Sequence, residues 1–206
     1  QQVSSAASDV YKRQIYDRNG EMLAWNEEDY TDEYSFPVRA YTDREGLGQL
    51  IGYVSYPLKD DHGFYYRNDY VGRNGVEASY DEILAGFNGK QIVEENALGE
   101  VIAEHAIKTP EVGQGVTLSI DVGLSEAMYN IISTSTTQAG FRSGAAAIMD
   151  VETGEIIAMT SYPSYDPEVM ADGDDVGLID SYNNDDRFPF LNKVVAGAYT
   201  LSLIHI

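Results

Sequence analysis

The chain of 206 residues has no cysteine and few basic residues: 13 lysines and arginines against 34 aspartates and glutamates, a formal net charge of −21. The absence of cysteine excludes disulfide bonds, thiolate metal sites and a cysteine nucleophile. This acidic excess leaves no basic face to follow a phosphate backbone, and an anionic membrane surface would repel the chain. We therefore expect no nucleic-acid partner.

Long apolar runs are absent as well. No stretch reaches the ~18 apolar residues that a membrane span needs, and residues 1–14 lack the basic-then-apolar order of a signal peptide. Any membrane anchor or targeting segment is therefore expected outside this chain. With 43% hydrophobic and 11% aromatic residues, the chain is nevertheless rich enough in apolar groups to bury a core.

The first half of the sequence alternates short strand patterns with one helical pattern. Asn19-Gly20 lies between two apolar segments and predicts a β-hairpin. Apolar residues recur at helical spacing over residues 76–89. Residues 90–93 and 101–107 indicate two further strands, and the Pro- and Gly-containing segment 109–115 indicates a linker. We expect a domain boundary in this linker.

The second half begins with a strand over residues 116–120, and Asp121 follows as the expected N-cap of a helix that fades near residues 133–137. Residues 145–150 and 155–161 indicate a second hairpin, with a glycine at its turn. The acidic stretch 166–186 is expected to be a long loop. Together these patterns predict an α+β protein.

The residues themselves offer little catalytic chemistry. The three histidines, His62, His105 and His205, match no zinc-binding spacing, and we expect none of them to bind metal or to act in catalysis. A second candidate is the acidic group Asp172, Asp174 and Asp175, because calcium prefers clustered carboxylates. This group lacks the calcium-loop pattern, so a solvated acidic loop is favoured over a cation site.

Five short motifs, in order, resemble those of class B penicillin-binding proteins, which are peptidoglycan D,D-transpeptidases. The resemblance runs from about residue 14 to residue 200. Its motifs are Ile15–Ala24 with an Asp-Arg-Asn-Gly turn, Leu50–Val54, Gly72–Gly89, Val116–Asp121 and Ala145–Pro167. Any one of these pieces is short enough to arise by chance. Five of them in the order that the family shows are not expected by chance.

This resemblance implies an α+β fold in two parts. Residues 14–112 would form a β-rich pedestal, or dimerisation, domain. Residues 113–200 would form the N-terminal part of an α/β transpeptidase domain of the serine β-lactamase type, cut short after its first helix and hairpin. Residues 1–13 and 201–206 do not resemble the family, and we expect them to be non-native tails. In the pedestal, we expect Arg73 to pair with Glu77 and to hold a helix against a loop.

The catalytic motifs of the family are missing. Its members attack the substrate carbonyl with the serine of a Ser-x-x-Lys motif and carry a Lys-Thr-Gly motif further on. Here no lysine has a serine three positions before it, and Lys-Thr-Gly does not occur. Ser181-Tyr182-Asn183 spells Ser-x-Asn but lies before the expected nucleophile, so we interpret it as coincidence. Because Asn192–Thr200 resembles the stretch that leads into Ser-x-x-Lys, we expect the nucleophile just after residue 200 in a longer protein.

The resemblance thus predicts part of an enzyme that cross-links cell-wall stem peptides through an acyl-serine intermediate. No catalytic, cofactor-binding or metal-binding residue is expected in this chain, which would be inactive alone. The longer protein would bind peptidoglycan stem peptides and β-lactams, possess cell-wall synthesis partners, and be anchored at the extracytoplasmic face of the cell envelope. One alternative is a noncatalytic envelope scaffold that contacts peptidoglycan or division and elongation proteins. A generic acidic extracellular domain would explain the charge but not the order of the motifs.

Overall fold

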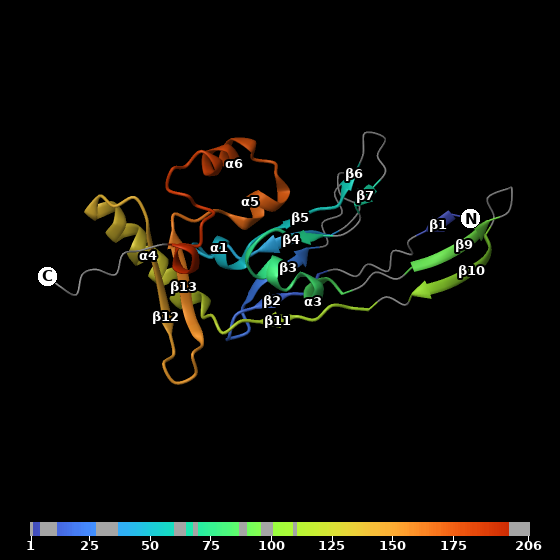
Figure 1. The fold of residues 1–206 in the computed structure, drawn as a ribbon, viewed down its shortest axis with the longest axis horizontal. Helices are drawn as coiled ribbons and strands as arrows, with labels where there is room; N and C mark the ends of the chain where they lie inside the picture. Colours follow the sequence, from blue (N-terminus) through green and yellow to red (C-terminus); the bar gives the residue numbers. More distant parts are fainter. Residues whose placement is uncertain are drawn as a thin grey trace.

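The computed structural model describes residues 2–4, 12–27, 37–59, 65–67, 70–86, 90–95, 101–108 and 111–197. The expected α+β class is confirmed, because sheets and helices follow one another along the chain. The molecule is elongated: a three-stranded sheet lies at one end, a mixed sheet in the middle, and a helix with a hairpin at the other end (Figure 1). The part up to residue 112 is called the N-terminal part below, and the part from residue 113 the C-terminal part.

A four-stranded sheet forms the middle of the molecule. Its order is β11-β2-β3-β4, and its strands are β2 (Ile15–Tyr16), β3 (Met22–Glu27), β4 (Val38–Tyr41) and β11 (Val116–Thr117). The hairpin predicted around Asn19-Gly20 is present, and Gly20 adopts a φ of 85° at its turn. Strand β11 lies parallel to β2. The C-terminal part therefore begins by adding a strand to the sheet of the N-terminal part.

Short elements pack against this sheet and complete the core. They are α1 (Gly48–Ile51), β5 (Val54–Ser55), β6 (Leu58–Lys59), β7 (Tyr65–Arg67), β8 (Val71–Gly72), α2 (Gly75–Ser79) and α3 (Asp81–Ala85). The single helix expected over residues 76–89 is instead α2 and α3, because Tyr80 leaves helical geometry with a ψ of 21°. The core between the sheet and the helices contains several almost completely buried side chains, among them Leu23, Leu47, Ile51 and Leu84.

The three-stranded sheet at one end of the molecule is antiparallel, in the order β1-β9-β10 (Figure 1). Its strands are β1 (Gln2–Ser4), β9 (Lys90–Glu95) and β10 (Val101–Lys108). The two strands predicted on either side of residues 96–100 are thus confirmed.

In the described residues of the C-terminal part, β11 is followed by one long helix, a hairpin and three short helices. Asp121 caps α4 (Val122–Ala139) by accepting a hydrogen bond from the Leu124 N–H at 2.9 Å, as predicted. The helix continues past residues 133–137 and ends at Gly140 in the left-handed conformation. The predicted hairpin is present as β12 (Gly144–Met149) and β13 (Ile156–Tyr162), and α4 packs against it.

The prediction of a long loop over residues 166–186 is wrong, because this segment contains α5 (Pro167–Asp172) and α6 (Val176–Asn183). Asp166 and Asp175 cap these helices, so two of the acidic residues that suggested a loop are helix starts. Helix α7 (Lys193–Ala196) follows. In the described part of the chain, no helix is both long and apolar enough to cross a membrane.

Candidate functional site

A completely buried ion pair lies at the centre of the N-terminal part. The Arg39 guanidinium contacts Glu77 Oε1 through Nε and Nη2, each at 2.8 Å, and both side chains have no exposed surface. The expected pairing of Arg73 with Glu77 is therefore wrong. The Glu77 carboxylate points into the core, whereas Arg73 lies at the surface and donates to Ser55 Oγ at 3.0 Å. The pair joins β4 to α2.

The remaining polar groups around this pair are satisfied. Arg39 Nη1 donates to Asn26 Oδ1 at 3.0 Å, and both of its terminal nitrogens donate to backbone carbonyls of residues 12–13. Lys12 Nζ contacts Glu77 Oε2 at 3.1 Å and also reaches Asp81. The two cations and two carboxylates of this group carry no net charge, as a buried group requires. Lys12 belongs to the tail expected to be non-native, yet only 1% of its surface is exposed.

The Asp-Arg-Asn-Gly turn links the N-terminal part to α4. The buried Asp17 accepts hydrogen bonds from the backbone N–H groups of Asn19 at 2.7 Å and Glu21 at 2.8 Å. It also accepts one from Val122 at the start of α4, at 3.4 Å. Asn19 Nδ2 donates to Asp121 Oδ2 at 3.1 Å. Asp121 accepts the Leu124 N–H as the cap of α4, and this hydrogen bond and then the Asn19 amide lower the pKa of its carboxyl.

A second connection runs through α1, where Gln49 is 6% exposed. Its Nε2 donates to the carbonyl of Pro163 at 2.9 Å and to that of Pro189 at 2.5 Å, and its Oε1 accepts from Ser164 Oγ at 2.9 Å. Nearby, Thr160 Oγ1 donates to the Gly46 carbonyl at 2.8 Å. One amide thus uses both of its donors and one acceptor position to hold the C-terminal part.

Two tyrosines add further contacts between the parts. Tyr56 donates to Asp172 Oδ1 at 3.1 Å, and Tyr165 accepts from Asn74 Nδ2 at 2.9 Å. Burial raises the pKa of both phenols, so both hydroxyls stay protonated. Burial, and then the carboxylate of Asp174, raises the pKa of Asp172. These contacts and those of Gln49 and Thr160 are called the junction below.

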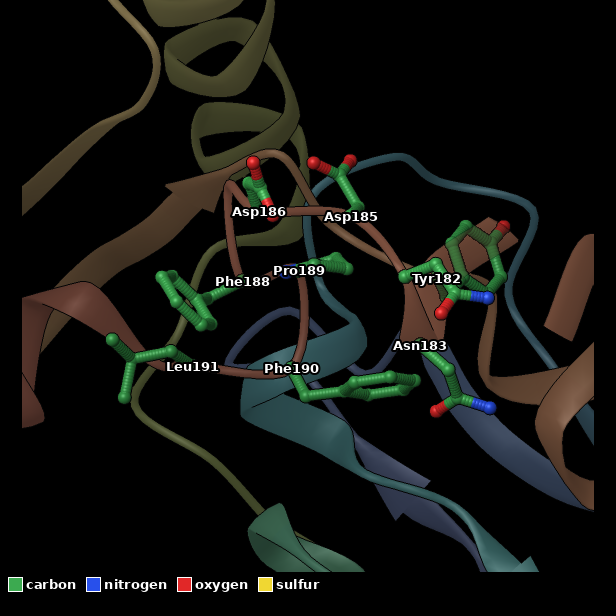
Figure 2. A pocket seen from close by; sticks show the side chains of 9 residues that line it. Tyr182, Asn183, Asp185, Asp186, Phe188, Pro189, Phe190 and Leu191 are labelled. Carbon is green, nitrogen blue, oxygen red and sulfur yellow. The ribbon is translucent and has the colours of Figure 1, made fainter. Parts of the chain in front are cut away.

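The segment after α6 forms a hollow of about 540 Å³ beside the junction, shown in Figure 2. Its lining consists of Tyr182–Asp186 and Phe188–Leu191. The ring of Phe190 packs against Tyr165, with ring centres 4.9 Å apart, and against Tyr182 at 6.3 Å. The segment is therefore held against the rest of the molecule by aromatic packing as well as by the Pro189 carbonyl.

The residues singled out for metal chemistry do not form a site in the described part of the chain. His62 and His205 lie outside the described residues, and His105 lies on β10. Asp172 is bound by Tyr56, and Asp175 caps α6. Among the described residues, no group of three or more histidine, aspartate or glutamate side chains is arranged to hold a metal ion.

Serine and lysine meet at α7, but not as a catalytic pair. The Ser161 hydroxyl accepts from the backbone N–H of Lys193 at 3.1 Å, whereas the Lys193 ammonium donates to the Phe188 carbonyl at 2.9 Å. Burial lowers the pKa of Lys193. Ser181, of the Ser-x-Asn triplet, donates to the Leu178 carbonyl on its own helix. All three groups stabilise the fold locally.

Sequence reasoning missed the two polar residues on which this arrangement depends, Arg39 and Gln49. A signal existed for Arg39, because a charge stands there between the apolar Val38 and the apolar Ala40 and Tyr41 of a strand. Gln49 stands between Leu47 and Leu50, and its polarity offered a weaker signal. Charged or amide groups inside apolar runs are buried only when they are paired, so such positions indicate structural contacts.

Comparison with known proteins agrees with this architecture. Residues 34–118 match the profile of the Penicillin-binding Protein dimerisation domain. The chain is 30% identical over 186 residues to the peptidoglycan D,D-transpeptidase MrdA of Escherichia coli, an alignment covering 82% of this chain and 28% of that protein. The chain thus spans little more than a quarter of that relative's length.

Solved structures of penicillin-binding proteins share the fold. PBP2 of Pseudomonas aeruginosa superposes with a TM-score of 0.66 at 27% identity, over 91% of this chain and 36% of that one. PBP2 of Helicobacter pylori, in its complex with MreC, superposes with a TM-score of 0.68 at 21% identity, over 89% of this chain and 47% of that one. The chain is therefore a homologue of the peptidoglycan D,D-transpeptidases and carries a penicillin-binding protein dimerisation domain.

Proposed function

We propose that this chain is the pedestal and the first portion of the catalytic domain of a penicillin-binding peptidoglycan D,D-transpeptidase, with the boundary near residue 112. The longer protein would cross-link cell-wall stem peptides through an acyl-serine intermediate and would be acylated by β-lactams at the same serine. The observation that carries this proposal is the alignment with MrdA, which covers 82% of the chain and so extends well beyond residues 34–118.

The physical roles of the described residues support this assignment. The ion pair of Arg39 and Glu77 and the contacts of Asp17 and Gln49 are buried, paired and directed at other parts of the fold. Such groups set the position of one segment relative to another and carry out no bond-making chemistry. The function of this chain within the longer protein is accordingly support for the catalytic domain.

The test is covalent labelling with a fluorescent penicillin. We expect no label on the 206-residue chain, since its sequence contains no Ser-x-x-Lys motif. We expect label on a longer gene product that continues past residue 200, at the serine of that motif. Stable labelling of the 206-residue chain, or a longer product without Ser-x-x-Lys, would contradict the proposal.

The location and partners of the longer protein follow from the same proposal. It would act at the extracytoplasmic face of the cell envelope, anchored by a segment outside this chain, and would contact other proteins of cell-wall synthesis. The H. pylori relative was solved in a complex with MreC, which favours a protein partner. If the longer product takes no penicillin yet is retained by purified peptidoglycan or by such a protein, the noncatalytic scaffold becomes the better description.

A further inference from the structure

The side chain of Gln49 connects three segments that are distant in the sequence. It arises from α1, its Nε2 reaches the carbonyls of Pro163 and Pro189, and both prolines are buried. Pro163 follows β13, whereas Pro189 lies in the segment between α6 and α7 (Figure 2). Because these carbonyls belong to buried prolines, the amide supplies hydrogen bonds that water is poorly placed to replace.

Helix α1, which carries this amide, is closely packed. Leu47 and Ile51, on either side of Gln49, are each 1% exposed. The backbone of α1 also lies close to the C-terminal part: a Cβ added to Gly48 would lie only 2.3 Å from the carbonyl oxygen of Tyr165. A residue on so constrained a helix has little freedom, and its side chain can set the place of what it binds.

The segment that Gln49 holds continues directly into α7. The Leu191 N–H donates to the Phe188 carbonyl at 3.1 Å, and the Lys193 ammonium donates to the same carbonyl. Asn192 caps α7 by accepting from the Val194 N–H at 3.2 Å. Residues 188–196 are therefore one hydrogen-bonded unit, attached to β13 through Ser161 and to α1 through Gln49.

We propose that Gln49 is a positioning residue that sets the place of α7 relative to the N-terminal part. This rests on the proposed function, in which the nucleophile comes shortly after residue 200. The Gln49 amide then couples the pedestal to the rate of serine acylation: when its two donors are lost, α7 remains attached to β13 but is released from α1.

The first experiment uses the 206-residue chain and amide hydrogen exchange. Gln49→Met keeps the length of the side chain but removes both donors and leaves two buried carbonyls without them. We expect exchange at Leu191, Lys193 and Ala196 to accelerate about 10- to 100-fold, with α4 unchanged. The control is Asn74→Ala, which removes another hydrogen bond across the junction, the one to Tyr165, and should leave these three amides as in the wild type.

Unchanged exchange in Gln49→Met would overturn the proposal, and so would equal acceleration in the Asn74→Ala control. If Gln49→Met does not fold, Gln49→Asn replaces it. That variant retains an amide but is one methylene shorter, so it cannot reach both carbonyls, and the same acceleration is expected.

The second experiment measures acylation of the longer protein by labelled penicillin. We expect Gln49→Met to slow acylation about tenfold while the thermal midpoint stays near that of Asn74→Ala, whose acylation should be normal. Acylation at the wild-type rate despite faster exchange would overturn the coupling. If even the wild-type longer protein takes no penicillin, the proposed function fails, and the exchange experiment still decides whether Gln49 positions α7.

Discussion

Replacing Glu77 with glutamine tests the importance of the buried ion pair. The substitution preserves shape and removes only the negative charge, so Arg39 and Lys12 remain in the core; among the described residues, the carboxylate still paired with either of them is Asp81, which contacts Lys12. Removing one partner of a buried pair costs about 3–5 kcal/mol, because the remaining charge is uncompensated. Since domains are stable by only about 5–15 kcal/mol, we expect Glu77→Gln to lose roughly a fifth or more of the unfolding free energy.

Urea denaturation followed by tryptophan fluorescence measures this loss. The single tryptophan, Trp25, lies on β3 opposite Ala40, next to Arg39 on β4, and so reports on the affected sheet. With a urea dependence of about 2 kcal/mol per molar, the midpoint should fall by about 1.5–2.5 M. The control is Glu155→Gln, which removes an exposed pair with Arg18 at 3.8 Å and should cost at most about 1 kcal/mol.

A double variant separates the pair from its surroundings. Arg39→Met combined with Glu77→Gln removes both charges, so it should be more stable than the sum of the two single losses by about 0.5–3 kcal/mol. The reasoning is refuted if Glu77→Gln loses less than about 1 kcal/mol, if Glu155→Gln loses as much, or if the two single losses are additive.

Three further predictions concern a cap, a carboxyl group and a glycine. Asp121→Ala should destabilise the chain by about 1 kcal/mol in thermal unfolding followed by circular dichroism, because α4 loses its N-cap; an unchanged midpoint would contradict this. The raised pKa of Asp172 means that its ionisation opposes folding, a cost that is absent below the unfolded pKa, grows as pH rises from the unfolded toward the folded pKa, and is complete above the folded pKa. Asp172→Asn, which retains an acceptor for Tyr56, should therefore raise the thermal midpoint at pH 7 but not near pH 3. Equal gains at both pH values would show that ionisation of a buried Asp172 carboxyl is not the cause. Gly52→Ala should cost more than about 1–2 kcal/mol in urea unfolding, because φ is 78° there and a Cβ would lie 1.9 Å from the Asn74 carbonyl oxygen. A variant as stable as the wild type would show that the backbone can move apart at this contact without cost.

Local patterns determined most of the secondary structure. The hairpins around Gly20 and Gly154, the strands β9 and β10, and the Asp121 cap all followed from residues close together in the sequence. One error is also local: the aspartates of residues 166–186 predict a loop where α5 and α6 form, because aspartates both cap helices and populate loops. Neighbouring residues alone do not distinguish these two uses.

The pairing of polar groups, by contrast, depends on the folded arrangement of distant segments. Glu77 was expected to pair with the nearby Arg73, yet its partner is Arg39, 38 positions away, and the carbonyl that Gln49 holds at Pro189 is 140 positions away. Periodicity and capping act over a few residues, whereas burial forces a polar group to find a partner wherever the chain brings one. Residues close together in the sequence therefore predict most of the elements and carry the family resemblance, whereas the contacts that join the two parts arise only when folding brings distant groups together.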